Sequence, residues 1–194
     1  MTETPKYELI DRDADIEIRR YAGYIKAEVT VDGHNYRNAV ERGFRVLADF
    51  IFGNNVSRRK IEMTTPVQAS PVEKIAMTTP VTVTMSGEYV VAFIMPAAYT
   101  MDTLPLPNDQ RIRFSAIPEH SAAAIRFNGY FNKAKIEKNK ERLGSWLAEQ
   151  GLEADGEFIL AGYNPPWVPG FLARNEVMVR LKDTNKPKNV INLT

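Results

Sequence analysis

KIEMTTPV at residues 60–67 is followed 14 residues later by KIAMTTPV at residues 74–81, with seven of the eight positions identical. In each copy apolar and polar side chains alternate, which is the period of a β-strand. Each copy then reaches a proline, which cannot donate a backbone hydrogen bond and is typical of a strand end, an edge or a bulge. Residues 68–73, QASPVE, are turn-forming. The repeat therefore predicts a hairpin whose two strands share one sequence.

Strands are also expected on both sides of this repeat. Residues 7–31 predict two strands with a turn at 11–15, because apolar residues alternate with charged ones at Ile16 and Ile18 and alternation resumes at 24–31. Residues 88–95 are apolar on both faces, which predicts a central strand covered on both sides.

Two stretches, 35–52 and 132–150, have the 3.6-residue period of amphipathic helices. The apolar stripes of the two stretches are formed by Val40, Phe44, Leu47 and Ile51, and by Ile136, Leu143, Trp146 and Leu147. Of these residues, burial is predicted for Val40, Phe44, Leu47, Trp146 and Leu147.

The second half of the chain has the same element order as the first. Strands predicted at 111–117 and 121–128 precede the second helix, and strands at 157–161 and 176–181 follow it. Strand-strand-helix-strand-strand thus occurs twice, as a repeat of pattern rather than of residues. The short turns favour an α+β fold with a largely antiparallel sheet. We expect one domain over 1–194, with its core at about 7–181 and a polar tail at 182–194.

The composition of the chain excludes several classes of function. The chain has 25 basic and 24 acidic side chains, so it lacks the basic excess of a nucleic-acid-binding domain. It has no cysteine, which excludes disulfides and thiolate chemistry. No run of 18 apolar residues occurs, so no membrane partner is expected. The polar N-terminus shows no signal peptide, which predicts a cytoplasmic protein.

Catalytic motifs are missing from the sequence. Only two histidines occur, and His34 and His120 both fall in predicted turns, where capping or exposure is expected. Neither has a partner at metal-ligand spacing. The chain contains no Gly-x-Ser-x-Gly elbow, no phosphate-binding glycine loop and no pair of carboxylates suited to acid–base work. The sequence therefore predicts a protein that is not an enzyme and holds no metal.

One loop has an unusual composition. GYNPPWVPGFL at 162–172 combines three prolines with the aromatic residues Tyr163, Trp167 and Phe171. Two interpretations remain open: the rings fill one end of the sheet, or the loop is a stiff flap over a ligand cleft. If the loop is a flap, we expect Phe44, Ala48 and Ile51 to form the apolar wall opposite it. Met63 and Met77 would provide an adaptable lining. The cationic rim of the cleft would consist of Arg58, Arg59, Lys60 and Arg174.

The repeated I-x-M-T-x-P-V phrase resembles the SOUL family, also called haem-binding proteins. YELI at 7–10, IEIRRY at 16–21, the strand before Pro96, AGYNPPW at 161–167 and RNEV at 174–177 agree with this resemblance, which extends over about 7–181. The resemblance implies a distorted antiparallel barrel of two pseudo-symmetric strand-helix-strand halves with both helices packed outside. It also implies a haem or porphyrin bound in a hydrophobic cleft between the first helix and the loop before the last strand, with propionates at the basic rim.

The chain departs from the family pattern at Arg20. Some members have histidine immediately before the tyrosine at the position of Tyr21, so iron ligation through that position is excluded here. Binding would rest on apolar contact and salt pairs, with Tyr163 or a methionine as a further contact.

The sequence therefore predicts a non-enzymatic, monomeric carrier or buffer that binds a tetrapyrrole reversibly. Two alternatives stay open. One is a binding module for other apolar or cationic small molecules, similar to gyrase-inhibitor-like effector domains, which acidic residues in the cleft would favour. The other is an enzyme acting on tetrapyrroles, which would need an acid–base group.

Overall fold

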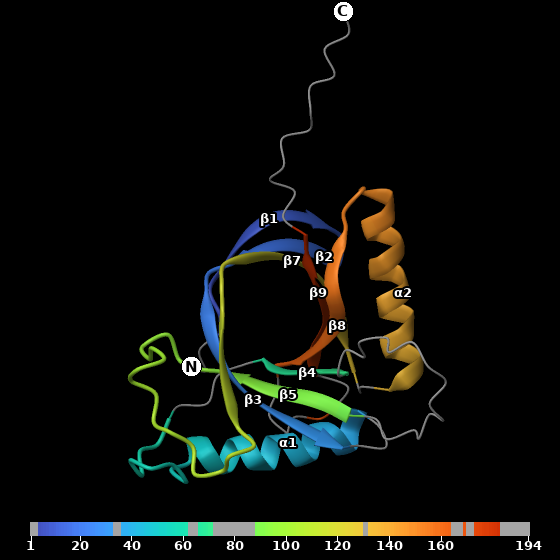
Figure 1. The fold of residues 1–194 in the computed structure, drawn as a ribbon. Helices are drawn as coiled ribbons and strands as arrows, with labels where there is room; N and C mark the ends of the chain where they lie inside the picture. The colour runs from blue at the N-terminus through green and yellow to red at the C-terminus, as the bar shows by residue number, and fades with distance from the viewer. Residues whose placement is uncertain are drawn as a thin grey trace, which may run out of the picture.

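The computed structural model describes residues 4–32, 36–61, 66–71, 88–129, 132–163, 169 and 173–182 (Figure 1). The helices are α1 (Tyr36–Ile51) and α2 (Lys133–Glu149). The strands are β1 (Tyr7–Asp13), β2 (Ile16–Tyr21), β3 (Tyr24–Asp32), β4 (Val67–Pro71), β5 (Glu88–Ile94), β6 (Arg113–Ile117), β7 (His120–Asn128), β8 (Ala154–Gly162) and β9 (Arg174–Leu181). No helix in this part of the chain is both long and apolar enough to cross a bilayer.

The strands form one antiparallel sheet in the order β1-β2-β7-β9-β8-β4-β5-β3-β6. The predicted α+β class with two helices on an antiparallel sheet is confirmed. Among the described residues β1 and β6 are the two ends of the sheet and do not pair with each other. The sheet is strongly curled (Figure 1), but it is not closed, so the expected barrel is not confirmed.

Both halves of the chain build the sheet in the same order. Outward from the central β4–β8 pair the order is β4-β5-β3-β6 on one side and β8-β9-β7-β2 on the other. Each helix connects equivalent strands, since α1 lies between β3 and β4 in the chain and α2 lies between β7 and β8. This arrangement matches the repeated pattern expected from the sequence, with β2 and β6 each paired to a strand of the other half.

The two helices cover the same face of the sheet. Side chains of directly paired residues point to one face, so the register identifies which residues share it. Ala69 of β4 pairs with Leu160 of β8 and with Val91 of β5, which joins the two apolar clusters on this outer face. Figure 1 shows both helices outside the curled sheet.

Each helix buries its own apolar cluster. The cluster between α1 and the sheet consists mainly of Val29, Leu47, Phe50, Ile51, Val91 and Phe93. The cluster between α2 and the sheet consists mainly of Ile125, Ile136, Leu143, Leu147, Val177 and Val179. Gly43 lets α1 approach β5 closely, because an added Cβ there would lie 2.5 Å from Cβ of Val91.

The expected burial is only partly correct. Leu47 and Leu147 are buried, as predicted, whereas Val40, Phe44 and Trp146 are only partly buried. The ring of Phe44 packs edge-on against Phe93, 5.3 Å between centroids. Trp146 stays at the surface because its indole nitrogen donates to Asp13 at 2.8 Å.

Two strand predictions need correction. Residues 7–32 form three strands rather than two, with a tight turn at Ala14, whose φ is 52°. Residues 67–71, most of which were expected to form a turn, are strand β4 in the interior of the sheet. Pairing with strands on both sides overrides the turn preference of these small and polar residues. Of the repeated phrase, the structure describes Lys60, Ile61, Pro66 and Val67 in the first copy, and the second copy lies outside the described residues.

Candidate functional site

The inner face of the sheet, opposite the helices, carries charged side chains. In β2 the residues Glu17, Arg19 and Tyr21 alternate with the outer-face residues Ile16 and Ile18. All three are buried, because the curled sheet encloses them. The alternation of apolar and charged residues in this strand was expected, whereas the burial of its charged residues has no counterpart in the sequence analysis.

Arg19 and Glu176 form the centre of this inner face. The two side chains are 1% and 0% exposed, and they make a bidentate ion pair with distances of 2.7 and 2.9 Å. Arg19 also donates to Glu17 through Nε at 2.7 Å and to the hydroxyl of Tyr21 at 3.0 Å. A buried guanidinium is tolerated here because each side of its planar fork meets an acceptor.

Tyr163 and Arg174, both predicted site residues, complete the arrangement. The Tyr163 hydroxyl donates to Oε2 of Glu176 at 2.6 Å, and Nη2 of Arg174 donates to Oε1 at 2.7 Å. The Arg174 guanidinium also lies 4.2 Å from the centroid of the Tyr163 ring. We call Glu17, Arg19, Tyr21, Tyr163, Arg174 and Glu176 the inner charge network.

The pKa values in this network are shifted away from neutrality. Burial alone would raise the pKa of Glu176, but hydrogen bonds and charge from Arg19 outweigh it and lower the pKa to about 2. Burial raises the pKa of Tyr163, and the neighbouring Glu176 charge raises it further. Burial likewise raises the pKa of Tyr21. At neutral pH the carboxylate is ionised and the phenols are protonated, which suits a structural network better than proton transfer.

Both buried carboxylates are charge-compensated. Glu176 meets Arg19 and Arg174, and Glu17 meets Arg19 and Arg12, the latter at 2.5 Å. The network therefore offers no excess negative charge to a cationic ligand. In the described part of the chain, no group of three or more His, Asp or Glu side chains is placed to hold a metal ion.

His120 differs from the expectation of an exposed turn residue. It is the first residue of β7, is 8% exposed, and stacks on Tyr21 with 5.5 Å between ring centroids. Its Nδ1 lies 2.9 Å from the carbonyl oxygen of Pro118, which can only accept, so Nδ1 carries a proton. Tertiary pairing with β2 buries the ring at a position where the local sequence indicates a turn. His34 lies outside the described residues.

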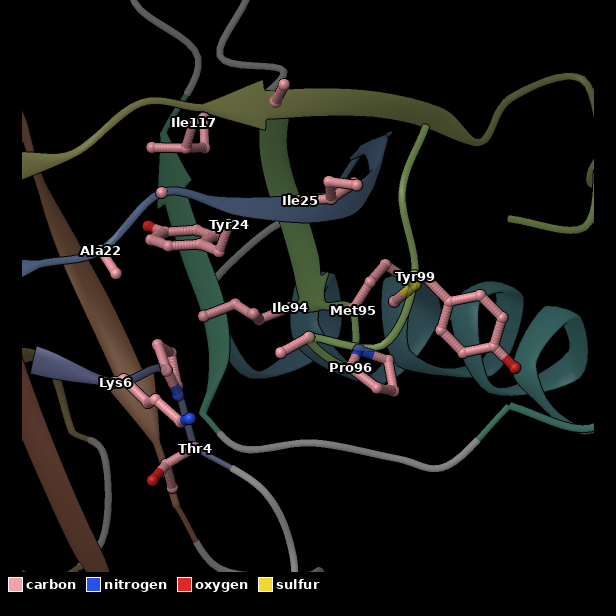
Figure 2. A pocket seen from close by; sticks show the side chains of 14 residues that line it. Thr4, Lys6, Ala22, Tyr24, Ile25, Ile94, Met95, Pro96, Tyr99 and Ile117 are labelled. Carbon is pink, nitrogen blue, oxygen red and sulfur yellow. The ribbon is translucent and has the colours of Figure 1, made fainter. Parts of the chain in front are cut away.

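An apolar pocket of about 320 Å³ opens where β3 begins and β5 and β6 end. Figure 2 shows Tyr24 and Ile25 from β3, Ile94 from β5 and Ile117 from β6 among the residues around it. Met95, Pro96 and Tyr99 follow β5 on one side of the pocket, and Thr4 and Lys6 of the N-terminal segment lie on the other (Figure 2). The pocket joins a mostly apolar lining to a lysine, a combination that suits an apolar molecule with an anionic group.

The predicted site residues fall in three places. Phe44, Ala48 and Ile51 belong to α1, where Phe44 faces the sheet and Ala48 and Ile51 are buried. Arg58, Arg59 and Lys60 are exposed on the segment after α1. Tyr163 and Arg174 meet in the inner charge network. The remaining predicted residues, Met63, Met77, Trp167 and Phe171, lie outside the described residues. The cleft formed by these groups remains a prediction.

Sequence analysis missed the inner charge network and the apolar pocket. The inner charge network had a signal in the sequence, because Arg19 and Glu176 are opposite charges inside two predicted strands, IEIRRY and RNEVMVRL. The apolar pocket had no such signal, because its lining comes from four separate segments of the chain.

The family model of the SOUL heme-binding proteins matches residues 2–180. This chain belongs to the SOUL heme-binding protein family. It is 26% identical over 174 residues to heme-binding protein 2 of Homo sapiens, covering 89% of this chain and 81% of the human protein. It is also 26% identical over 163 residues to heme-binding protein 1 of Xenopus laevis, covering 83% and 80% of the two chains.

Solved structures share the fold of this SOUL chain at low sequence identity. The C-terminal domain of EcmrR superposes with a TM-score of 0.64 at 9% identity, covering 91% of this chain and 98% of that domain. A hydrolase from Listeria innocua superposes with a TM-score of 0.58 at 9% identity, covering 89% and 94%. At such identity these similarities concern the fold alone.

Proposed function

We propose that this protein binds a tetrapyrrole, haem or a porphyrin, reversibly and acts as a carrier or buffer rather than as an enzyme. The observation that carries this proposal is the match of the SOUL heme-binding family model to residues 2–180. The two haem-binding relatives cover most of the chain and support it.

The apolar pocket is the binding site that we propose for the ligand. Its volume of about 320 Å³ falls at the lower end of the range for small-molecule sites, so it would take one edge of a macrocycle. Ile94, Met95 and Ile117 offer apolar contact, and Lys6 offers a cation to a propionate. Trp167 and Phe171 of the aromatic loop, which the sequence predicts as a flap over a cleft, remain a separate proposed contact for the ligand.

The inner charge network supports binding without catalysis. The pKa values of Glu176, Tyr163 and Tyr21 are all shifted away from the range of a general acid or base at neutral pH. Two buried carboxylates would favour the alternative of a module for cationic small molecules. Each is already paired with two guanidinium groups, so a cationic ligand would have to displace an arginine.

A titration followed in the Soret band tests the proposal. Hemin and iron-free protoporphyrin should both bind saturably, because apolar contact and propionate pairing act on both molecules. Replacing His34 and His120 with alanine should leave most of the hemin affinity of the folded protein. Failure of both ligands to bind would overturn the proposal, and binding of hemin alone would show that iron ligation dominates instead.

The aromatic loop has its own test. If Trp167 contacts the ligand, Trp167→Ala should weaken hemin binding about tenfold or more while the thermal midpoint changes little. If the ring fills the end of the sheet, the same change should lower stability and leave the affinity of the folded protein intact. Both quantities are measured on the same variant.

A further inference from the structure

Three large apolar side chains are exposed on two joined segments beyond the C-terminal end of α1. Phe52, Val56 and Leu106 are 62%, 65% and 66% exposed. Phe52 and Val56 belong to the segment that leaves α1, and Leu106 belongs to the loop between β5 and β6. Figure 1 shows these two segments meeting past the end of α1, away from β1. We call Phe52, Val56 and Leu106 the apolar tip.

Hydrogen bonds hold the two segments of the apolar tip together. The amide of Val56 donates to the carbonyl of Leu106 at 2.9 Å, and Asn55 forms a β-bridge with Pro107. The buried side chain of Asn55 donates to the carbonyls of Phe50 and Arg59 and accepts from the amide of Arg59. The tip is therefore a braced part of the fold, although three of its side chains face water.

The backbone around Leu106 fixes its outward direction. Leu104 and Pro105 are buried and anchor this part of the loop, while Leu106 stands exposed between Pro105 and Pro107. Prolines on both sides restrict the backbone, so the leucine cannot readily turn inward. Single exposed apolar residues are ordinary, whereas a braced group of three indicates a surface that meets an apolar partner.

Cations lie directly beside the apolar tip. Arg58, Arg59 and Lys60 are exposed on the same segment, and the amide of Arg58 donates to the carbonyl of Asn55. The acidic groups of these segments are partly engaged: Asp49 accepts from Asn54, and Asp109 pairs with Arg111 at 2.6 Å. Asp102 is the remaining acidic residue of the described 97–112 loop.

We propose that the apolar tip and Arg58, Arg59 and Lys60 dock this protein onto the surface of an anionic lipid bilayer. Apolar side chains that enter the headgroup boundary, flanked by cations that meet anionic lipids, provide the two contributions that peripheral binding requires. The sequence predicted no membrane partner because no segment can span a bilayer. Docking at the surface needs no spanning segment, so the proposal departs from that expectation without requiring one.

Sedimentation with vesicles tests the proposal without any tetrapyrrole present, so its outcome is independent of the proposed function. The protein should bind vesicles of phosphatidylcholine mixed with phosphatidylserine more strongly than vesicles of phosphatidylcholine alone. Added salt should weaken the binding, because it screens exposed charges.

Variants separate the two contributions. Phe52→Ser, Val56→Ser and Leu106→Ser combined should lower the partition onto mixed vesicles about tenfold or more. Arg59→Glu with Lys60→Glu should lower it by at least about fivefold per charge and remove the preference for phosphatidylserine. These side chains are exposed, so the thermal midpoint should be unchanged.

Leu9→Ser with Ile10→Ser is the matched control, because both side chains are exposed on β1, away from the tip. It should retain vesicle binding. The proposal is overturned if the unaltered protein does not sediment with mixed vesicles, or if the control loses as much binding as the tip variant. It is also overturned if gel filtration shows a dimer that the tip variant abolishes while vesicle binding is absent, since the tip would then join two copies of the chain.

Discussion

The two faces of the sheet bury different chemistry. The outer face packs apolar side chains such as Val91 and Val177 against the helices. The inner face buries Arg19 with two glutamates, Glu17 and Glu176, whose charges are balanced by Arg19 together with the more exposed Arg12 and Arg174. Apolar packing tolerates modest changes of shape, whereas a buried ion pair tolerates the loss of neither partner. Stability should therefore respond in different ways to substitutions on the two faces.

The largest effect is expected at Arg19. Arg19→Ala leaves the fully buried carboxylate of Glu176 without its bidentate partner, and should lower the free energy of unfolding by about 3–5 kcal/mol. Urea unfolding measures this. Arg19→Met combined with Glu176→Leu should recover part of the loss, because it removes both buried charges of the pair, although the Tyr163 hydroxyl then loses its acceptor.

A surface ion pair provides the control for Arg19. Arg142 pairs with the half-exposed Asp15 at 2.8 Å, and Arg142→Ala should cost about 1 kcal/mol or less. An Arg19→Ala variant no less stable than Arg142→Ala would contradict the role given to the inner charge network.

The outer face should respond through cavity formation. Leu47 of α1 is fully buried against the sheet, so Leu47→Ala should lower the unfolding free energy by about 2–5 kcal/mol. Phe44 is only partly buried, so Phe44→Ala should cost less than the about 3–5 kcal/mol of an enclosed phenylalanine. A larger loss for Phe44→Ala than for Leu47→Ala would show that the face of α1 has been misassigned.

Acid should weaken the inner face selectively. The pKa of Glu176 is lowered from its ordinary 4.5 to about 2, because its hydrogen bonds and ion pair with Arg19 outweigh burial. The resulting stability is fully present above pH 4.5 and is lost as the pH falls toward 2. Unfolding free energies measured over this range should fall less steeply for Glu176→Gln than for the unaltered protein. Parallel curves would mean that Glu176 does not have a lowered pKa.

Periodicity predicted the outer face of the fold well. The helix stretches 35–52 and 132–150 agree with α1 and α2 within a residue or two, because each has an apolar stripe that must meet a sheet. Strand β4 was missed, since its pairing with two distant strands has no local signal in QASP.

The inner face was missed for a different reason. Alternation in IEIRRY shows that the strand has two unlike faces, but not that the charged face meets water. Arg19 and Glu176 are 157 residues apart in the chain, so only the sheet order brings them together. Of the predicted site, Tyr163 and Arg174 do meet, although they contact Glu176 rather than an open cleft among the described residues.

We expect ligand binding at the apolar pocket and none at the inner charge network. We expect the tetrapyrrole at the pocket, whereas the network maintains the fold. Two adjacent alanines allow a direct comparison, because Ala97 lines the pocket, Ala98 does not, and both are exposed. Phenylalanine at position 97 should obstruct the pocket, and phenylalanine at position 98 should leave it open.

Hemin titration of Ala97→Phe and Ala98→Phe, followed in the Soret band, is the most direct measurement. With the pocket as the binding site, Ala97→Phe should weaken hemin binding about tenfold, equivalent to about 1.4 kcal/mol, while Ala98→Phe matches the unaltered protein. Equal affinities for all three proteins would contradict the assignment of the pocket, and the absence of any Soret change in the unaltered protein would contradict tetrapyrrole binding itself.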